Sequence, residues 1–345
     1  LGWLAGQVGA PIAMALLLAA AVMMPGVCRG SWRTAWQEAT FGLGMLLLAT
    51  IGFVWLVPES APWLHRSVIV LVAAVATGLI AGLGPAWLAP SQRDWIAAGR
   101  RMASLCTALA IAMLALVLLQ EAWLFDRAGD GVVAWPAAVV IAGAIAGLIV
   151  MALGVALRPD WDPLQLSDRG RTVYVYAAEL LGGLLALHLW LALPWLFRYG
   201  IVERYWMLIV MAIAAAGAGL SELFQRRRLP VLSEPLARTA LLLPLVPIVG
   251  FWFVDSANAA TWLPVGASPS LWFVIGLFYG VMAITRQSVV LAGLAIVTAN
   301  TGLWVLWHRQ GWDFFDRPQL WLIPIAIAVL VAEHLDRGGD QSLDI

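Results

Sequence analysis

Residues 132–157 read VVAWPAAVVIAGAIAGLIVMALGVAL, an uninterrupted apolar stretch without a single charged side chain. A helix needs about 20 apolar residues to cross the roughly 30 Å hydrocarbon core of a bilayer. This stretch is therefore long enough to cross as one helix. A strand of an outer-membrane barrel would instead alternate in polarity over about 10 residues. The stretch predicts a transmembrane helix.

The whole chain has the composition of a membrane protein. Of its 345 residues, 62% are hydrophobic and only 12% are charged, and the mean hydropathy is +0.89. A soluble domain carries about 25% charged residues, so this chain has too little charge to cover a water-facing surface. The composition excludes a soluble enzyme, a nucleic-acid-binding protein and a disordered scaffold.

Eleven stretches meet the length criterion for a membrane span. They predict an all-α fold, a polytopic transmembrane helical bundle of successive helical hairpins, in a single domain over residues 1–345. The chain opens inside an apolar run without Met, as a piece of a longer chain would. The predicted spans are 3–24, 39–57, 67–89, 102–124, 132–157, 172–197, 205–224, 239–255, 269–284, 289–307 and 319–335.

The basic residues, all of them Arg, predict the orientation. Loops rich in Arg stay in the cytoplasm. Six of the 20 arginines lie in the even-numbered loops, which leaves fourteen in the odd-numbered loops and the C-terminal tail. We therefore expect a bacterial inner-membrane protein with its N-terminus outside and its C-terminus in the cytoplasm. The six are Arg66, Arg127, Arg198, Arg204, Arg309 and Arg317.

Tryptophans support the same orientation, because the indole ring prefers the headgroup level of a bilayer. Trp55 and Trp63 bracket the second loop, and Trp123 and Trp135 bracket the fourth, both on the arginine-poor side. The later even-numbered loops follow the same pattern. The pattern indicates helical hairpins whose outer turns are framed by tryptophans. One interpretation is a repeated two-helix unit; the other, which we favour, is an ordinary aromatic belt.

Glu179 is the first candidate for a functional side chain, because a carboxyl within a span is costly without a reason. Tyr176 precedes it by three residues and is placed to bond it, while Gly182 and Gly183 would let another helix approach closely. A proton- or cation-coupled carboxyl is one interpretation; a Glu that holds helices together is the other, and we favour it. His188 lies half a helical rotation away, so we expect a packing role and no relay with Glu179.

The tenth predicted span holds a polar run near mid-membrane, with Thr298, Asn300 and Thr301. An unwound stretch that lines a cavity is one interpretation, and simple bridging between helices is the other. In the eighth predicted span, Pro244 and Pro247 remove backbone donors and predict a kink.

The predicted cytoplasmic loop RPDWDPLQLSDRGR (158–171) holds a second candidate site, formed by Asp160, Asp162 and Asp168. Three carboxylates would suit a divalent cation or a lipid headgroup. The loop also contains three arginines, and local ion pairs with them are the interpretation that we favour. No cofactor or metal motif occurs in the sequence, so we expect no cofactor, no resident metal and no nucleic-acid partner.

From about residue 158 onward, three stretches carry a family resemblance: DPLQLSDRGRTVYVYAAE (162–179), LSELFQRRRLPVLSEPLARTALLLPL (220–245) and HRQGWDFFDRPQLWLIP (308–324). In these stretches the chain resembles a family of long, uncharacterised bacterial multi-pass membrane proteins. The resemblance implies further helices beyond this segment. It implies no activity and transfers no catalytic residue.

Three functions remain open on the sequence. The favoured one is a non-catalytic helical scaffold or membrane-complex subunit, which is in contact with the lipid bilayer and with protein partners through Gly-x-x-x-Gly faces. The second is a small-molecule or ion transporter with a cavity among spans six to ten. The third is a lipid-linked transferase that uses the 158–171 loop. The three Gly-x-x-x-Gly pairs are Gly78–Gly82, Gly143–Gly147 and Gly276–Gly280.

Overall fold

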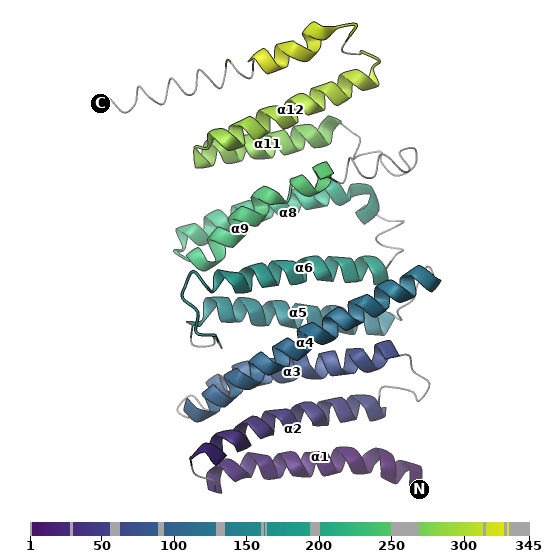
Figure 1. The fold of residues 1–345 in the computed structure, drawn as a ribbon, viewed down its shortest axis with the longest axis vertical. Helices are drawn as coiled ribbons and strands as arrows, with labels where there is room; N and C mark the ends of the chain where they lie inside the picture. The colour runs from purple at the N-terminus through teal and green to yellow at the C-terminus, as the bar shows by residue number, and fades with distance from the viewer. Residues whose placement is uncertain are drawn as a thin grey trace, which may run out of the picture. The chain divides into compact units, whose positions relative to one another are not determined.

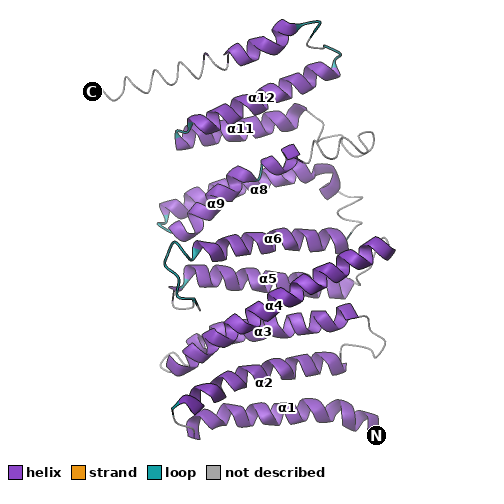
Figure 2. Ribbon diagram, viewed as in Figure 1, coloured by secondary structure: helices purple, strands orange, loops and turns teal. Residues whose placement is uncertain are grey.

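A computed structural model gives the fold, and every regular element in the part of the chain that it describes is a helix (Figure 2). The described residues are 2–27, 30–55, 63–88, 93–128, 135–159, 162, 164–193, 201–249, 269–312, 315–327 and 330. The main helices are α1 (Gly2–Val27), α2 (Ser31–Trp55), α3 (Trp63–Leu88), α4 (Arg93–Ala128), α5 (Trp135–Leu157), α6 (Thr172–Ala192), α8 (Ile201–Arg226), α9 (Pro230–Leu242), α11 (Pro269–Arg286) and α12 (Val289–Arg309).

Nine helical segments among the described residues are long and apolar enough to cross a membrane. Each overlaps one of nine of the eleven predicted spans. The first and last predicted spans are represented by shorter apolar helices, Pro11–Pro25 and Pro318–Ile327. The prediction of an all-α multi-pass bundle is confirmed.

The chain divides into two compact units, unit 1 (Leu1–Phe197) and unit 2 (Arg198–Ile345). Each unit has a buried apolar cluster of its own. That the whole chain forms one transmembrane domain stays a prediction.

Unit 1 consists of three helical hairpins, α1–α2, α3–α4 and α5–α6 (Figure 1). In each hairpin, the two helices pack against each other more extensively than against the other helices of the unit. Further contacts join α2 to α3 and α4, α3 to α5, and α4 to α6. The most extensive pairings are therefore those across the arginine-rich loops, and α2 also packs on α3 across the tryptophan-framed second loop. Consecutive helices separated by few residues in the sequence, such as α3 and α4, tend to pack side by side.

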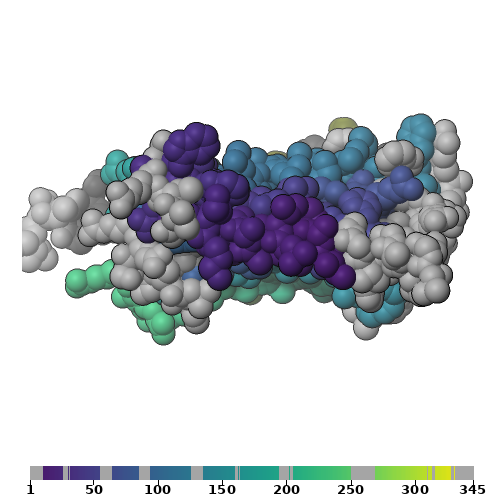
Figure 3. Space-filling view, turned by 90° about the horizontal axis from the view of Figure 1, so that it is seen from below, coloured from purple at the N-terminus to yellow at the C-terminus, as the bar shows by residue number. Residues whose placement is uncertain are grey.

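The core of unit 1 follows from the helical period. In α5, Ala138, Ile141, Ile145 and Leu148 recur every three or four residues and are all buried. The opposite face of α5 is just as apolar but exposed, with Val150 60% accessible. On α1, which crosses the middle of the face in Figure 3, exposed side chains such as Leu16 and Met23 are apolar too. An apolar core with an apolar surface is what a bilayer solvent requires.

Unit 2 is built from the hairpins α8–α9 and α11–α12, with α8 also in contact with α11. Its core includes Met207, Ile275 and Tyr279, and the Tyr279 hydroxyl donates a hydrogen bond to the Leu241 carbonyl oxygen at 3.0 Å. A Cβ atom on Gly276 would lie 3.2 Å from the Ala295 carbonyl oxygen. Glycine at this position therefore allows α11 and α12 to approach closely.

The kink predicted in the eighth span is confirmed. Helix α9 ends at Leu242, residues 243–244 form a turn, and a helical segment resumes over 245–249. The apolar helical segment as a whole covers Pro230–Val249, whereas the predicted span begins at residue 239. Proline is well suited to the first turn of a helix because its missing N–H would have no partner there, and Pro230 begins this one.

Candidate functional site

A carboxyl and an imidazole meet in the core of unit 1. Glu121 on α4 and His188 on α6 are among the most buried polar side chains described, at 1% and 0% exposure. His188 Nδ1 lies 2.8 Å from Glu121 Oε2. His188 Nε2 lies 3.0 Å from the carbonyl oxygen of Ala138 on α5. One imidazole therefore links three helices.

The hydrogen bonds constrain where the protons of this pair lie. The Ala138 carbonyl only accepts, so Nε2 must carry a hydrogen and donate it. One further hydrogen must lie between Nδ1 and Oε2, either as an N–H that donates to a carboxylate or as a carboxyl O–H that donates to the imidazole. Both arrangements have a net charge of zero. The Glu121–His188 pair therefore avoids the cost of an isolated charge in an apolar core.

The pair lies near the tryptophan-bearing end of unit 1. Ala138 belongs to the first turn of α5, close to the exposed Trp135. The rings of Phe125 and Trp190 pack with centroids 5.7 Å apart. The pair thus lies in the core beside the tryptophan-bearing ends of α4, α5 and α6.

Sequence reasoning found half of this site. The packing role expected for His188 agrees with both ring nitrogens being bonded. Glu121 was missed because it follows the apolar run of its span and resembles an interfacial residue. A signal was present: Glu121 and His188 each precede a tryptophan by two residues, Trp123 and Trp190. Helices α4 and α6 run in the same direction, so this spacing puts both side chains at one depth.

Glu179 lies on α6 and is partly buried, as is Tyr176 one turn before it. The close helix approach expected beside them is not present within the described residues, because Cβ atoms on Gly182 or Gly183 would have no atom within 4 Å. A coupling role for Glu179, and its hydrogen bond with Tyr176, stay predictions.

The polar run of the tenth predicted span belongs to α12, which is helical throughout Val289–Arg309. The expected unwound stretch is therefore wrong. Each polar side chain bonds to a carbonyl of its own helix: Thr298 Oγ1 to Leu294 at 2.7 Å, Asn300 Nδ2 to Ile296 at 2.9 Å, and Thr301 Oγ1 to Val297 at 2.9 Å. These bonds use both hydroxyls and the Asn300 amide nitrogen without a second helix. The Asn300 Oδ1 atom is buried and has no hydrogen-bond partner among the described residues.

In the acidic loop, Asp162 is 1% exposed and accepts three hydrogen bonds. The Leu164 amide and the Tyr174 hydroxyl donate to Oδ1 at 2.9 and 2.6 Å, and the Leu166 amide donates to Oδ2 at 2.6 Å. The side chain thus holds the loop against the start of α6. Most of its capacity to bind a cation is already used.

Asp168 forms the local ion pair that was favoured for this loop. Its Oδ1 lies 2.6 Å from the Arg171 guanidinium, which also donates to the Ala156 carbonyl at the end of α5. Asp162 and Asp168 thus have different partners, and Asp160 lies outside the described residues. Across the described part of the chain, no three His, Cys, Asp or Glu side chains are grouped to hold a metal ion.

The Gly-x-x-x-Gly faces pack mostly inside their own unit. A Cβ on Gly78 would lie 3.2 Å from the Met151 methyl group, and one on Gly147 would lie 2.8 Å from Val75. Gly276 packs on α12, as described above. Gly143 faces open space within the described structure. Binding of protein partners through these faces stays a prediction.

Comparisons with known proteins identify no relative. No model of a protein family matches the chain. A search of curated proteins found no match, and a search of solved structures found none. The resemblance to the bacterial multi-pass family stays a prediction. What is established is a multi-pass membrane protein built of apolar helices.

Proposed function

We propose that the protein is a non-catalytic helical scaffold or a subunit of a complex in a bacterial inner membrane. The observation that carries the proposal is the way in which the described intramembrane polar groups are used. Glu121 and His188 bond to each other across three helices, and Thr298, Asn300 and Thr301 bond to their own helix. Such bonds stabilise a helix cluster.

Proton flux into proteoliposomes tests the scaffold proposal. We expect vesicles with purified protein to acidify no faster than empty vesicles under an imposed pH gradient, because the Glu121–His188 pair is enclosed at 1% and 0% exposure. Valinomycin with potassium is added to both samples, so that a membrane potential built up by proton entry cannot limit the measured flux. A protein-dependent flux would contradict the proposal.

A proton-coupled transporter is the second candidate, and one atom favours it. Glu121 Oε1 is buried and has no hydrogen-bond partner among the described residues. Such an oxygen is a place to which a proton can be delivered. If flux is measured, Glu121→Gln should abolish it, since the amide cannot exchange a proton. Arg226→Gln is the control, because Arg226 lies in an exposed pair with Glu222. The transferase alternative has no comparable support, since Asp162 and Asp168 are already bonded.

We also propose the orientation that the arginines indicate, with the turns that join α3 to α4, α8 to α9 and α11 to α12 in the cytoplasm. The turn between α8 and α9 contains Arg227 and Arg228, and both are exposed. Short loops with an excess of Arg remain on the cytoplasmic side. Within each unit the most extensively packed helix pairs are joined by arginine-bearing segments, which supports insertion of each pair with its charged turn on the cytoplasmic side.

A further inference from the structure

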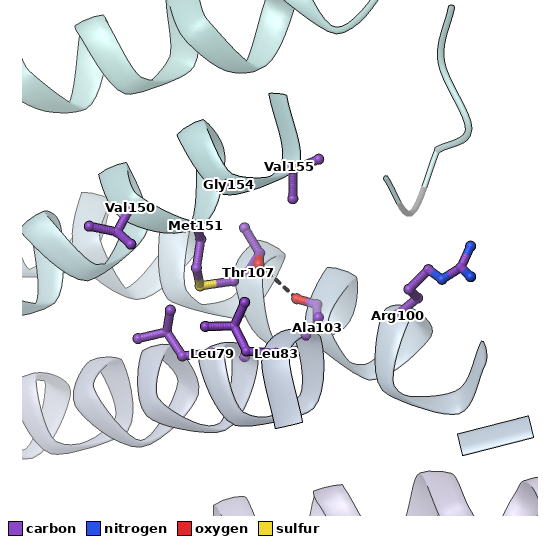
Figure 4. A pocket seen from close by; sticks show the side chains of 11 residues that line it. Leu79, Leu83, Arg100, Ala103, Thr107, Val150, Met151, Gly154 and Val155 are labelled. Carbon is purple, nitrogen blue, oxygen red and sulfur yellow. Dashed lines mark hydrogen bonds between the residues drawn. The ribbon is translucent and has the colours of Figure 1, made fainter. Parts of the chain in front are cut away.

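A cavity of about 250 Å³ opens between α3, α4 and α5 in unit 1 (Figure 4). It is distant in sequence from the Glu121–His188 pair and has a different character. Its walls are almost entirely apolar, with Leu79 and Leu83 from α3, Ala103 from α4, and Val150 and Met151 from α5. A site with such walls suits a hydrocarbon group.

Glycine and an internally bonded threonine give the cavity its shape. Gly78 and Gly82 on α3 line it without side chains. Thr107 on α4 also lines it, but its hydroxyl donates to the Ala103 carbonyl oxygen at 2.7 Å, as the dashed line in Figure 4 shows. The only hydroxyl in the lining is therefore already bonded. The interior offers a hydrocarbon chain contacts and offers a polar ligand almost none.

One end of the cavity lies at the arginine-rich end of α4, which the proposed orientation puts at the membrane surface. Helix α4 starts at Arg93, and its apolar run begins directly after Arg100 and Arg101. Thr107 is seven residues further along, about 10 Å deeper at 1.5 Å per residue. The lining residues of α3 and α5 lie near the same end, since α3 ends at Leu88 and α5 ends at Leu157. The cavity thus extends from the arginine-rich ends of these helices into their apolar stretches.

Arg100 lies at this surface end of the cavity (Figure 4). Its Nε is buried and has no hydrogen-bond partner among the described residues. Neighbouring arginines are paired: Arg101 lies 2.8 Å from Glu38, and Arg33 lies 3.5 Å from Asp94. Arg100 is thus a guanidinium whose side chain has no carboxylate partner within the described structure. An Arg between transmembrane helices at the cytoplasmic surface suits a phosphate headgroup.

We propose that this cavity binds an anionic phospholipid, with one acyl chain between α3, α4 and α5 and the headgroup phosphate at Arg100. The apolar walls account for the chain, and the guanidinium at the rim accounts for the charge. The guanidinium lies at the surface end and the apolar walls lie deeper, which is the order of the headgroup and the acyl chain in a lipid of the inner leaflet. The site goes beyond the scaffold function, since it would make one lipid a component of unit 1.

Two pairs of matched variants test the two halves of the site. Ala103→Phe fills the cavity, and Ala108→Phe places the same ring on an exposed position of the same helix. Arg100→Gln removes the charge at the rim, and Arg101→Gln removes a neighbouring charge that is paired with Glu38. The purified proteins are delipidated in detergent, and phosphatidylglycerol or phosphatidylcholine is titrated while bound lipid is counted by native mass spectrometry.

We expect Ala103→Phe to weaken phosphatidylglycerol binding about tenfold and Arg100→Gln to remove its preference over phosphatidylcholine, whereas both controls bind as the unmodified protein does. Equal binding of the two lipids, or unchanged binding in Ala103→Phe, overturns the proposal. Competition by free glycerol phosphate as effective as that by the lipid also overturns it, because the site would then recognise an anion alone.

A measurement on the unmodified protein avoids any folding defect in the variants. Phosphatidylglycerol with a photoreactive group in its acyl chain is bound to the full chain and illuminated, and the labelled peptides are identified. Labelling within 78–83, 103–107 and 150–155 supports the site. Labelling spread over exposed faces such as that of α1, with none in these three segments, overturns it.

Discussion

At the scale of single residues, the Glu121–His188 pair shows how a membrane protein keeps ionisable groups in its core. Breaking a buried pair by removing one partner costs about 3–5 kcal/mol, because the other group is left without compensation. We predict such a loss for Glu121→Leu and for His188→Leu, measured as reduced thermal stability in detergent. Glu121→Gln should cost much less, since an amide N–H can donate to Nδ1 across the 2.8 Å contact.

The double variant Glu121→Leu with His188→Leu provides the control. It removes both polar groups, so its loss of stability should be clearly smaller than the sum of the two single losses. Strictly additive losses would mean that the two side chains contribute independently. The hydrogen-bonded pair would then not be what holds α4, α5 and α6 together.

At the scale of helices, the packing of α11 on α12 depends on a small residue. Gly276→Ala puts a methyl group 3.2 Å from the Ala295 carbonyl oxygen and 3.3 Å from the Ala299 amide nitrogen, so the helices must separate. We predict a loss of about 1–3 kcal/mol, as for other overpacked sites. The measurement is thermal unfolding in detergent, followed by tryptophan fluorescence.

Gly293 on α12 supplies the matched control. A Cβ at this position would have no atom within 4 Å. Gly293→Ala should therefore be neutral or slightly stabilising, since alanine restricts the unfolded chain more than glycine does. Equal effects of the two substitutions would show that helix propensity, and not interhelical packing, determines the response.

The sequence could predict which residues are helical but not which helices are neighbours. Hydropathy located nine spans closely because burial in lipid depends on local composition. The tryptophan pattern suggested hairpins that turn at the even-numbered loops, whereas the most extensive packing joins α3 to α4 and α11 to α12 across odd-numbered loops. Thr298 and Asn300 were misjudged for a related reason, since bonds to their own helix leave the helical backbone intact.

The candidate site shows the same division. His188 was recognisable as a packing residue, but its partner is 67 residues away on another helix. Only the contact between α4 and α6 identifies Glu121. The loop at 158–171 was recognisably acidic, yet backbone amides and Tyr174, rather than arginine, satisfy Asp162. A pattern of residue types does not specify which donors a folded loop brings to a carboxylate.

At the scale of the whole molecule, the orientation is open to a direct test. In a background without Cys28 and Cys106, we place single cysteines at Gln225, beside the arginine turn of α8, and at Gln310, after α12; both positions are exposed. A membrane-impermeant maleimide added to intact cells should label Gln310→Cys and spare Gln225→Cys until the cells are permeabilised. The reverse pattern would invert the topology.

The neutrality of the Glu121–His188 pair also determines how unit 1 responds to voltage. A transmembrane potential acts on net charge, with about 2.3 kcal/mol per elementary charge per 100 mV. The pair holds one shared proton between Nδ1 and Oε2 and has no net charge in either arrangement. A transmembrane potential therefore exerts no net force on the pair in either arrangement, whereas it would act on Glu121 or His188 if one of them were charged alone.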